Sequence, residues 1–177
     1  MVEAALSKDL ILRLIEAAGE QLTGDWVLVG GALAALWFSP DRVTEDVDLI
    51  AVAERPDRRF ELMDFALAQG LPLETVNSAA DFFLRRFPRW TEDLELLHAG
   101  AQARIFRPTP TLFMLLKVGR MSEADLGDCL GLLELAERDG LALDRARVLA
   151  HLVALAEPES GRVAMRREAL RSRLAGG

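Results

Sequence analysis

The feature that most constrains this chain is an apolar segment that runs into two glycines and is followed, one helix later, by two aspartates at a second apolar segment. Residues 26–29 (Trp-Val-Leu-Val) are typical of a short buried strand, and they lead directly into Gly30 and Gly31. Residues 32–38 have the pattern of a helix, which the following Ser-Pro stops. Glycines at such a turn let the backbone approach a ligand, and the helix N-terminus presents N–H groups that suit phosphate.

The two aspartates stand at the start of the second predicted strand, residues 47–52. Alternate residues of a strand point to the same side, so we expect Asp46 and Asp48 to project from one face while Val47 and Leu49 enter the core. Two carboxylates held this close raise each other's pKa unless a cation lies between them. Oxygen ligands with room for phosphate favour Mg²⁺ or Mn²⁺ over zinc. The pattern therefore predicts a divalent-cation site beside the glycine turn.

Each half of this pattern also has a plain structural explanation. A strand–Gly-Gly–helix turn often serves only tight packing. Acids at a strand end are often solvated surface residues. The functional interpretation depends on the two halves occurring together.

The rest of the chain predicts a mixed first half and a helical second half. In the first half we expect helices over 7–22, with Ser7 as N-cap, and over 57–69 and 79–87, and a hairpin of strands 94–97 and 103–106 turning around Gly100. In the second half we expect helices over 110–120, 123–139, 144–156 and 161–174. The sequence thus predicts an α+β fold, with a mixed sheet flanked by helices in residues 1–108 and an all-helical region, 109–177, packed against that core.

Composition excludes several classes of protein. Hydrophobic residues make up 51% of the 177, enough for a real core, but no apolar run is long enough to predict a membrane span. Glu3 stands where a secretory signal would be basic, so a cytoplasmic setting is expected. Cys129 is the only cysteine, which rules out an intramolecular disulfide. The net charge of −7 argues against general DNA binding and leaves room for a local basic patch that engages RNA.

Together these features resemble the nucleotidyltransferase (polymerase-beta-like) superfamily, in particular its small bacterial branch with the AbiEii-type and MenT-type toxin nucleotidyltransferases. The resemblance is carried by Gly30-Gly31 and by residues 42–48, Arg-Val-Thr-Glu-Asp-Val-Asp. The branch's pattern is a hydrophobic residue, Gly-Gly or Gly-Ser, a helix, and then Arg-x-Thr-x-Asp-hydrophobic-Asp. A second match lies in residues 108–134. The resemblance covers residues 20–135, and the last forty or so residues carry no signature of this family.

The resemblance implies roles for the residues around the glycine turn. Gly30 and Gly31 would hold the phosphates of a nucleoside triphosphate through backbone N–H groups. Asp46 and Asp48 would coordinate Mg²⁺ (or Mn²⁺) that bridges those phosphates. Two further residues of the motif belong to the nucleotide-binding set: Arg42 and Thr44.

In the second match, the resemblance implies that Lys117 neutralises charge on the triphosphate. Asp125 or Asp128 would orient that lysine or complete the site. Full members of the superfamily also carry a third carboxylate on a later strand, and here the candidates are Asp93 and Glu95. These two would share a strand face if residues 93–97 form a strand. Neither matches the family pattern cleanly, so a catalytically degenerate member stays open.

The activity that the resemblance implies is transfer of a nucleoside monophosphate from an NTP to an acceptor hydroxyl. The acceptor would be an RNA end, such as that of a tRNA, or a protein side chain. The biological setting would be a toxin–antitoxin pair, with an antitoxin as partner, or a phage-defence system. Two alternatives stand beside this activity: a degenerate module that binds nucleotide or protein, and a helical interaction protein with an incidental acidic pair. The Arg-rich segment 161–174 is either a solvated helix face or a patch for RNA or a partner.

Overall fold

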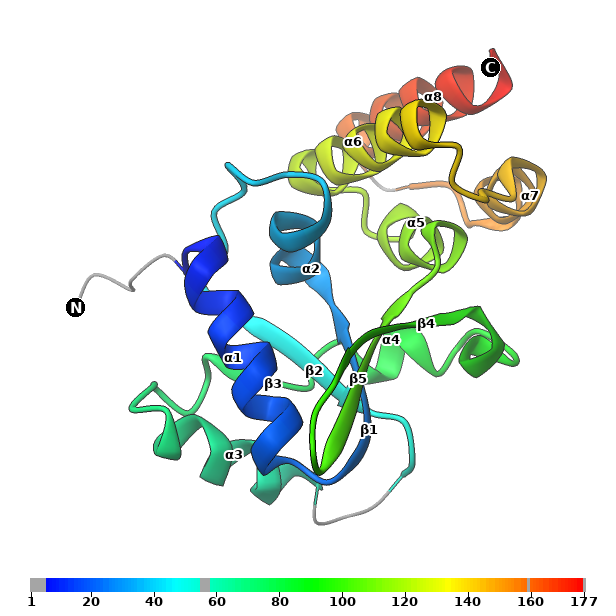
Figure 1. Cartoon of the computed structure of the whole chain (residues 1–177). Coiled ribbons are helices and arrows are strands. Elements are labelled where there is room, and N and C mark those ends of the chain that lie inside the picture. Colours follow the sequence, from blue (N-terminus) through cyan, green and yellow to red (C-terminus); the bar gives the residue numbers. More distant parts are fainter. Residues whose placement is uncertain (1–5, 55–57, 159, 177) are drawn as a thin grey trace. The chain divides into compact units, whose positions relative to one another are not determined.

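The structure, a computed structural model, describes residues 6–54, 58–158 and 160–176. The chain divides into two compact units, Met1–Pro108 and Thr109–Gly177. All the strands that the structure describes belong to the first unit, and the described elements of the second unit are helices (Figure 1). The α+β class predicted from the sequence is therefore confirmed.

The first unit is built on a five-stranded mixed sheet of strand order β3-β2-β1-β5-β4. Its strands are β1 Gly24–Val29, β2 Val47–Ala51, β3 Val76–Asn77, β4 Leu94–Ala99 and β5 Ala103–Pro108. The central strand β1 pairs antiparallel with β2 and parallel with β5, while β4 and β5 form the predicted antiparallel hairpin. Strand β1 is completely buried from Trp26 to Val29, which explains its continuous apolar run.

The helices of the first unit are α1 Lys8–Gln21, α2 Gly30–Trp37, α3 Arg58–Ala68 and α4 Asp81–Leu84, with a 3₁₀ turn, η1, at Trp90–Asp93. Ser7 caps α1 as predicted, because its hydroxyl accepts a hydrogen bond from the Leu10 N–H at 3.2 Å. Helix α1 packs on α2 and on β5, and α2 packs on β1 and β2 (Figure 1). The core at these contacts is aliphatic: Ile11, Leu14, Ile15, Ala18, Leu33 and Ala34 are all buried.

The second unit is made of four helices in its described residues: α5 Pro110–Val118, α6 Glu123–Asp139, α7 Arg145–Ala154 and α8 Gly161–Ala175. Helix α6 begins with a capping box, in which Ser122 and Asp125 satisfy each other's backbone N–H groups, and ends at Gly140 in the left-handed conformation. These four helices match the predicted ones to within two residues at each boundary. No helix in the described residues of either unit combines the length and apolarity needed to cross a membrane.

The structure corrects two details of the predicted elements. The helix expected over 79–87 is a single turn, α4, because its aromatic residues Phe82 and Phe83 are exposed and provide no buried stripe along a longer helix. The two-residue strand β3 was not predicted, since two residues are too short to show alternation. The helix expected from residue 57 begins at Arg58 in the described part of the chain, and residue 57 lies outside it.

Candidate functional site

The predicted glycine turn lies where β1 passes into α2. Gly30 is the first residue of α2 and has a φ of 76°, a left-handed conformation that side chains other than glycine's rarely adopt. A Cβ atom at this position would lie 2.5 Å from Oδ2 of Asp48. The Asp48 carboxylate therefore sits directly on the turn, on the strand β2 that pairs with β1 and with Val29 as its cross-strand partner.

The next glycine is enclosed by two other residues of the predicted motif. A Cβ on Gly31 would lie 2.9 Å from the Thr44 hydroxyl and 3.4 Å from an Arg42 guanidinium nitrogen. The Thr44 hydroxyl is within hydrogen-bond reach of the Asp46 carbonyl oxygen, at 3.1 Å, and of the Asp46 carboxylate, at 3.3 Å. Thr44 therefore links the Asp46 side chain to the glycine turn. Asp48 needs no such link, because its carboxylate contacts the turn directly.

The position of the acidic pair agrees with strand alternation. Val47 and Leu49 are buried, as expected, whereas Asp48 is half-buried and Asp46, which precedes β2, is exposed. Six predicted residues thus gather at one end of the β1–β2 pair: Gly30, Gly31, Arg42, Thr44, Asp46 and Asp48.

This donor set fits a magnesium ion that is shared with phosphates. Mg²⁺ in phosphate-handling sites is usually held by one or two carboxylates, with substrate oxygens and water completing the shell. Asp46 and Asp48 supply two carboxylates beside a backbone turn that has no side chain in the way. Among the described residues there is no group of three or more His, Cys, Asp or Glu side chains placed to hold a metal ion by protein ligands alone.

A cavity of about 540 Å³ borders this cluster. Three of the six gathered residues line it, Arg42, Thr44 and Asp46, whereas Gly30, Gly31 and Asp48 are not among its lining residues. The apolar part of its wall comes from Leu6, Leu10, Val43, Leu71 and Pro72. Leu6 is held in place by an isolated bridge to Thr44, in which its N–H donates to the Thr44 carbonyl at 2.8 Å. The segment from Arg42 to Asp46 thus borders a space whose walls are partly apolar and partly charged.

In the second unit, Lys117 lies in a buried charge network. Its ammonium donates to Asp128 Oδ2 at 2.7 Å and lies 3.3 Å from Asp125 Oδ1, and all three side chains are buried. Arg120 donates two hydrogen bonds to the Asp125 carboxylate, at 2.7 and 2.8 Å. Ser122 adds hydrogen bonds to it from its hydroxyl and its backbone N–H, at 2.8 and 3.0 Å. The network balances two cations with two anions and ties α5 to the start of α6.

The pKa of the Asp125 carboxylate shows the effect of this network. Burial by itself would raise the pKa of Asp125, but the hydrogen bonds from Arg120 and Ser122 and the charge of Lys117 outweigh it. The pKa of Asp125 is held well below its usual range. Asp125 is therefore ionised throughout the physiological pH range and is a fixed partner for Lys117.

Asp93 and Glu95 do not share a strand face, because the condition for it, a strand over residues 93–97, is not met. Asp93 is the last residue of the 3₁₀ turn η1, and β4 begins only at Leu94. The turn follows Arg89, whose left-handed φ of 55° redirects the chain. Glu95 does lie on β4, where it forms an ion pair of 2.8 Å with Arg107, its cross-strand partner on β5. The two acids are therefore in different local structures.

The Arg-rich segment forms α8, and most of its arginines are engaged within their own unit. Arg167 donates to the carbonyl oxygens of Ala156 and Gly119 at 2.9 and 2.8 Å. Arg171 pairs with Glu168 at 2.8 Å, and Arg173 lies 3.8 Å from Glu137. These contacts favour a structural role for α8 over a basic patch that is open to a partner.

Comparisons of this chain with protein-family models, with curated proteins and with solved structures found no match.

Proposed function

We propose that this protein is a metal-dependent nucleotidyltransferase that moves a nucleoside monophosphate from an NTP to an acceptor hydroxyl. The observation that carries the proposal is the direct contact of the Asp48 carboxylate with the Gly30 turn. Thr44 brings the Asp46 carboxylate to the same turn. A plain packing turn needs neither a carboxylate against its left-handed glycine nor a second one linked to the next residue.

Each residue has a separate task in this proposal. Backbone N–H groups at the start of α2 donate to the phosphates, where the positive end of the helix dipole also favours anions. Arg42 adds positive charge beside Gly31. Asp46 and Asp48 hold Mg²⁺, which when bound neutralises negative charge on the triphosphate as transfer proceeds. The acceptor oxygen forms a bond to the α-phosphorus, the bond from that phosphorus to the β-phosphate's bridging oxygen breaks, pyrophosphate leaves, and the hydroxyl proton passes to solvent.

The test is a transfer assay. The pure protein is incubated with Mg²⁺, total RNA and each of the four α-labelled NTPs in parallel, and RNA and protein are then separated and counted. We expect label in one fraction with at least one NTP, and a loss of about 100-fold or more in Asp48→Asn, because removing a metal ligand costs at least as much as removing its supporting contacts.

The matched control is Asp64→Asn, which removes an exposed aspartate on α3, away from the glycine turn. It should label as the unchanged protein does. Transfer that survives in Asp48→Asn, or that disappears equally in Asp64→Asn, would contradict the proposed roles of the acidic pair.

For Lys117, the role of neutralising the triphosphate stays a prediction of the resemblance. Its test is complicated by the buried network, because losing the ammonium leaves two buried carboxylates short of a cation. Transfer by Lys117→Met therefore has to be measured well below its unfolding temperature. A loss of transfer in a protein that is still folded would support the catalytic role, and full activity would remove Lys117 from the site.

A second candidate function is a degenerate module that binds nucleotide without transferring it. The specific observation in its favour concerns the two candidates for the third carboxylate: Asp93 is not on β4, and Glu95, which is on β4, is ion-paired with Arg107. Under this alternative, no NTP gives transfer, but the protein binds NTP with Mg²⁺ and the double variant Asp46→Asn, Asp48→Asn does not.

The setting in a toxin–antitoxin or phage-defence pair is part of the proposal for the active enzyme. It predicts that induced expression of the unchanged chain slows bacterial growth and that Asp48→Asn relieves the effect. Equal growth inhibition by both proteins would separate toxicity from nucleotide transfer.

A further inference from the structure

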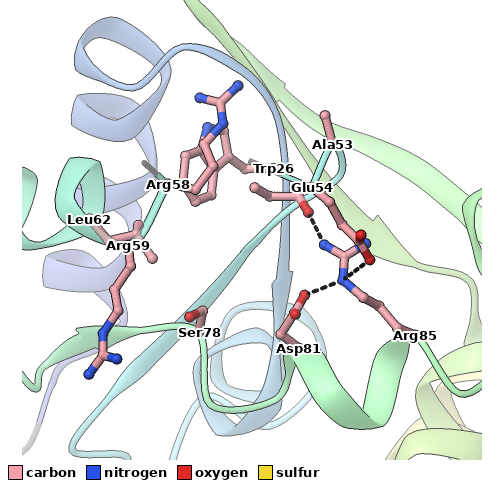
Figure 2. Close-up of a pocket in the computed structure, with 10 residues that line it drawn as sticks. Trp26, Ala53, Glu54, Arg58, Arg59, Leu62, Ser78, Asp81 and Arg85 are labelled. Atoms are coloured by element: carbon pink, nitrogen blue, oxygen red, sulfur yellow. Dashed lines mark hydrogen bonds and ion pairs between the residues drawn. The ribbon is translucent and has the colours of Figure 1, made fainter. Parts of the chain in front are cut away.

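Figure 2 shows a second cavity, of about 480 Å³. It lies at the other end of the β1–β2 pair from the glycine turn. Here Trp26 is the cross-strand partner of Ala51, whereas Val29 is the partner of Asp48 at the glycine-turn end. The two ends are three residues apart along β1, which is about 10 Å. None of the residues assigned to the nucleotide site lines this cavity.

Two arginines that line the cavity are held in place by contacts with neighbouring residues. The Arg58 guanidinium lies over the Trp26 ring at 5.3 Å and donates to the Thr23 carbonyl and to Glu61, both at 2.6 Å. Arg85 donates to Asp81 at 2.8 Å, as a dashed line in Figure 2 shows, and to the Ala51 carbonyl at 2.8 Å. Both guanidinium groups already have hydrogen-bond partners, so they form part of the cavity wall. An anionic ligand would therefore bind to other cationic side chains.

The cations available to a ligand stand beside these walls. Arg59 lines the cavity from α3, and Arg86 follows Arg85 just after α4; both are exposed. Neither has an acidic partner among the residues that the structure describes. The charge of these two side chains is thus open to solvent in a chain whose net charge is −7.

Two exposed aromatic rings adjoin the same segment. Phe82 is 69% exposed and Phe83 54%, and their ring centroids are 5.7 Å apart at an interplanar angle of 79°. The Arg86 guanidinium lies 5.6 Å from the Phe82 ring centre. Large rings exposed next to each other are unusual unless they meet a partner. Phe82, Phe83 and Arg86 together form the Phe–Arg surface, and Arg59 on α3 lines the adjoining cavity.

We propose that the Phe–Arg surface binds single-stranded RNA. Exposed aromatic rings beside arginines are what single strands require, because bases stack on the rings and phosphates pair with the cations. The adjoining cavity also offers the Ser78 hydroxyl, which suits a ribose that carries a 2′-hydroxyl. A duplex hides its base faces from such rings. RNA binding here needs neither Asp46 nor Asp48.

The test is a fluorescence anisotropy titration of a labelled 12-nucleotide single-stranded RNA with the full chain, at several salt concentrations. Phe82→Ala should weaken binding about 5- to 100-fold, the cost of losing one stacked base. Phe82→Trp should retain binding, and Phe82→Leu should weaken it as alanine does, because leucine keeps an apolar side chain without a ring face. Arg86→Ala should weaken binding and reduce the salt slope by about 0.7.

Matched controls come from α1, where Leu12 and Arg13 are an exposed apolar residue and an exposed cation in sequence. Leu12→Ala and Arg13→Ala should bind as the unchanged chain does. Because all the altered side chains are exposed, each variant should keep its unfolding temperature. The double variant Asp46→Asn, Asp48→Asn should bind RNA normally, so that RNA binding and nucleotide transfer can fail separately.

Four outcomes would overturn the proposal. The first is that the unchanged chain does not bind the RNA at 50 mM salt or below, and the second is that Phe82→Leu binds with full affinity. The third is that duplex RNA, or single-stranded DNA of the same sequence, binds as tightly as the single-stranded RNA. The fourth is that the protein binds phosphatidylserine-containing vesicles and does not bind RNA. Full affinity in Phe82→Leu would assign the rings to an apolar partner, and vesicle binding would assign the surface to membranes.

Discussion

At the scale of single residues, Gly30 and Asp48 determine the shape of the candidate site. Gly30 has a left-handed φ, and the space its side chain would occupy is taken by the Asp48 carboxylate. Both the backbone conformation and the close approach therefore require glycine at this position. The same contact holds the carboxylate where a phosphate-bound cation would need it.

Gly30→Ala should destabilise the protein by about 1–3 kcal/mol, through the left-handed backbone and the contact with Asp48. It should also impair Mg²⁺–NTP binding, because the carboxylate has to move. The comparison is Gly127→Ala on α6, where a Cβ meets nothing within 4 Å and the backbone is helical. That change should stabilise the protein by about 0.5–1 kcal/mol. Chemical denaturation of both variants provides the check, and equal effects would contradict the argument from Gly30's conformation.

At the scale of secondary structure elements, the junction of α5 and α6 depends on buried charge. Lys117, Asp125 and Asp128 are buried together, and Arg120 and Ser122 complete the hydrogen bonds of Asp125. Such a network is costly to break at one point, because the remaining charges stay buried without their partner. Replacing a whole pair by apolar side chains is far less costly.

Lys117→Met should therefore destabilise the protein by about 3–5 kcal/mol, and the double variant Lys117→Met, Asp128→Leu should recover part of that loss. Cys129 gives a convenient measurement, because burial raises the pKa of its thiol to about 12 and keeps it unreactive in the folded protein. The rate of thiol labelling should rise in the single variant and fall back in the double one. Additive effects of the two substitutions would show that Lys117 and Asp128 do not stabilise each other.

The same network predicts a dependence of stability on pH. The pKa of Asp125 is lower in the folded protein than in the unfolded chain, so its ionisation stabilises the fold fully above about pH 4, the ordinary carboxyl value. That contribution is lost progressively as the pH falls below this value. In urea titrations between pH 3 and 7, Asp125→Asn should be less stable at neutral pH and should lose less stability on acidification. If the unchanged protein and Asp125→Asn lost the same free energy of unfolding on acidification, the role of Asp125 would be contradicted.

At the scale of the whole molecule, ligand binding should couple to stability. A ligand that binds only the folded state adds about 2.7 kcal/mol at a concentration 100 times its Kd. For a chain of this length that corresponds to a rise in Tm of about 5–10 °C. We expect this rise with Mg²⁺ and the preferred NTP together, and a much smaller one with the NTP alone.

The double variant Asp46→Asn, Asp48→Asn should lose the magnesium-dependent part of the rise, whereas Asp64→Asn should keep it. A differential scanning fluorimetry series over the four NTPs, with and without Mg²⁺, measures both effects. A Tm that rises equally without the metal would argue against the acidic pair as its ligands.

The sequence by itself determined the elements that depend on local pattern. The apolar run of β1, the glycines after it, the alternation around Asp48 and the helical periodicity after Thr109 all express short-range constraints, and the structure has the corresponding elements. The grouping of Arg42, Thr44 and Asp48 around Gly30 and Gly31 followed from a motif whose parts are close in sequence. Only the tertiary structure decided the strand order, the short strand β3, the placement of Asp93 outside β4, and the burial of Lys117 between two aspartates. Likewise, the cavity beside Trp26 combines residues from β1, α3 and α4, which no local pattern connects. The physical reason is that pairing, burial and cavity shape depend on which distant segments pack together, and that choice is made by the whole core.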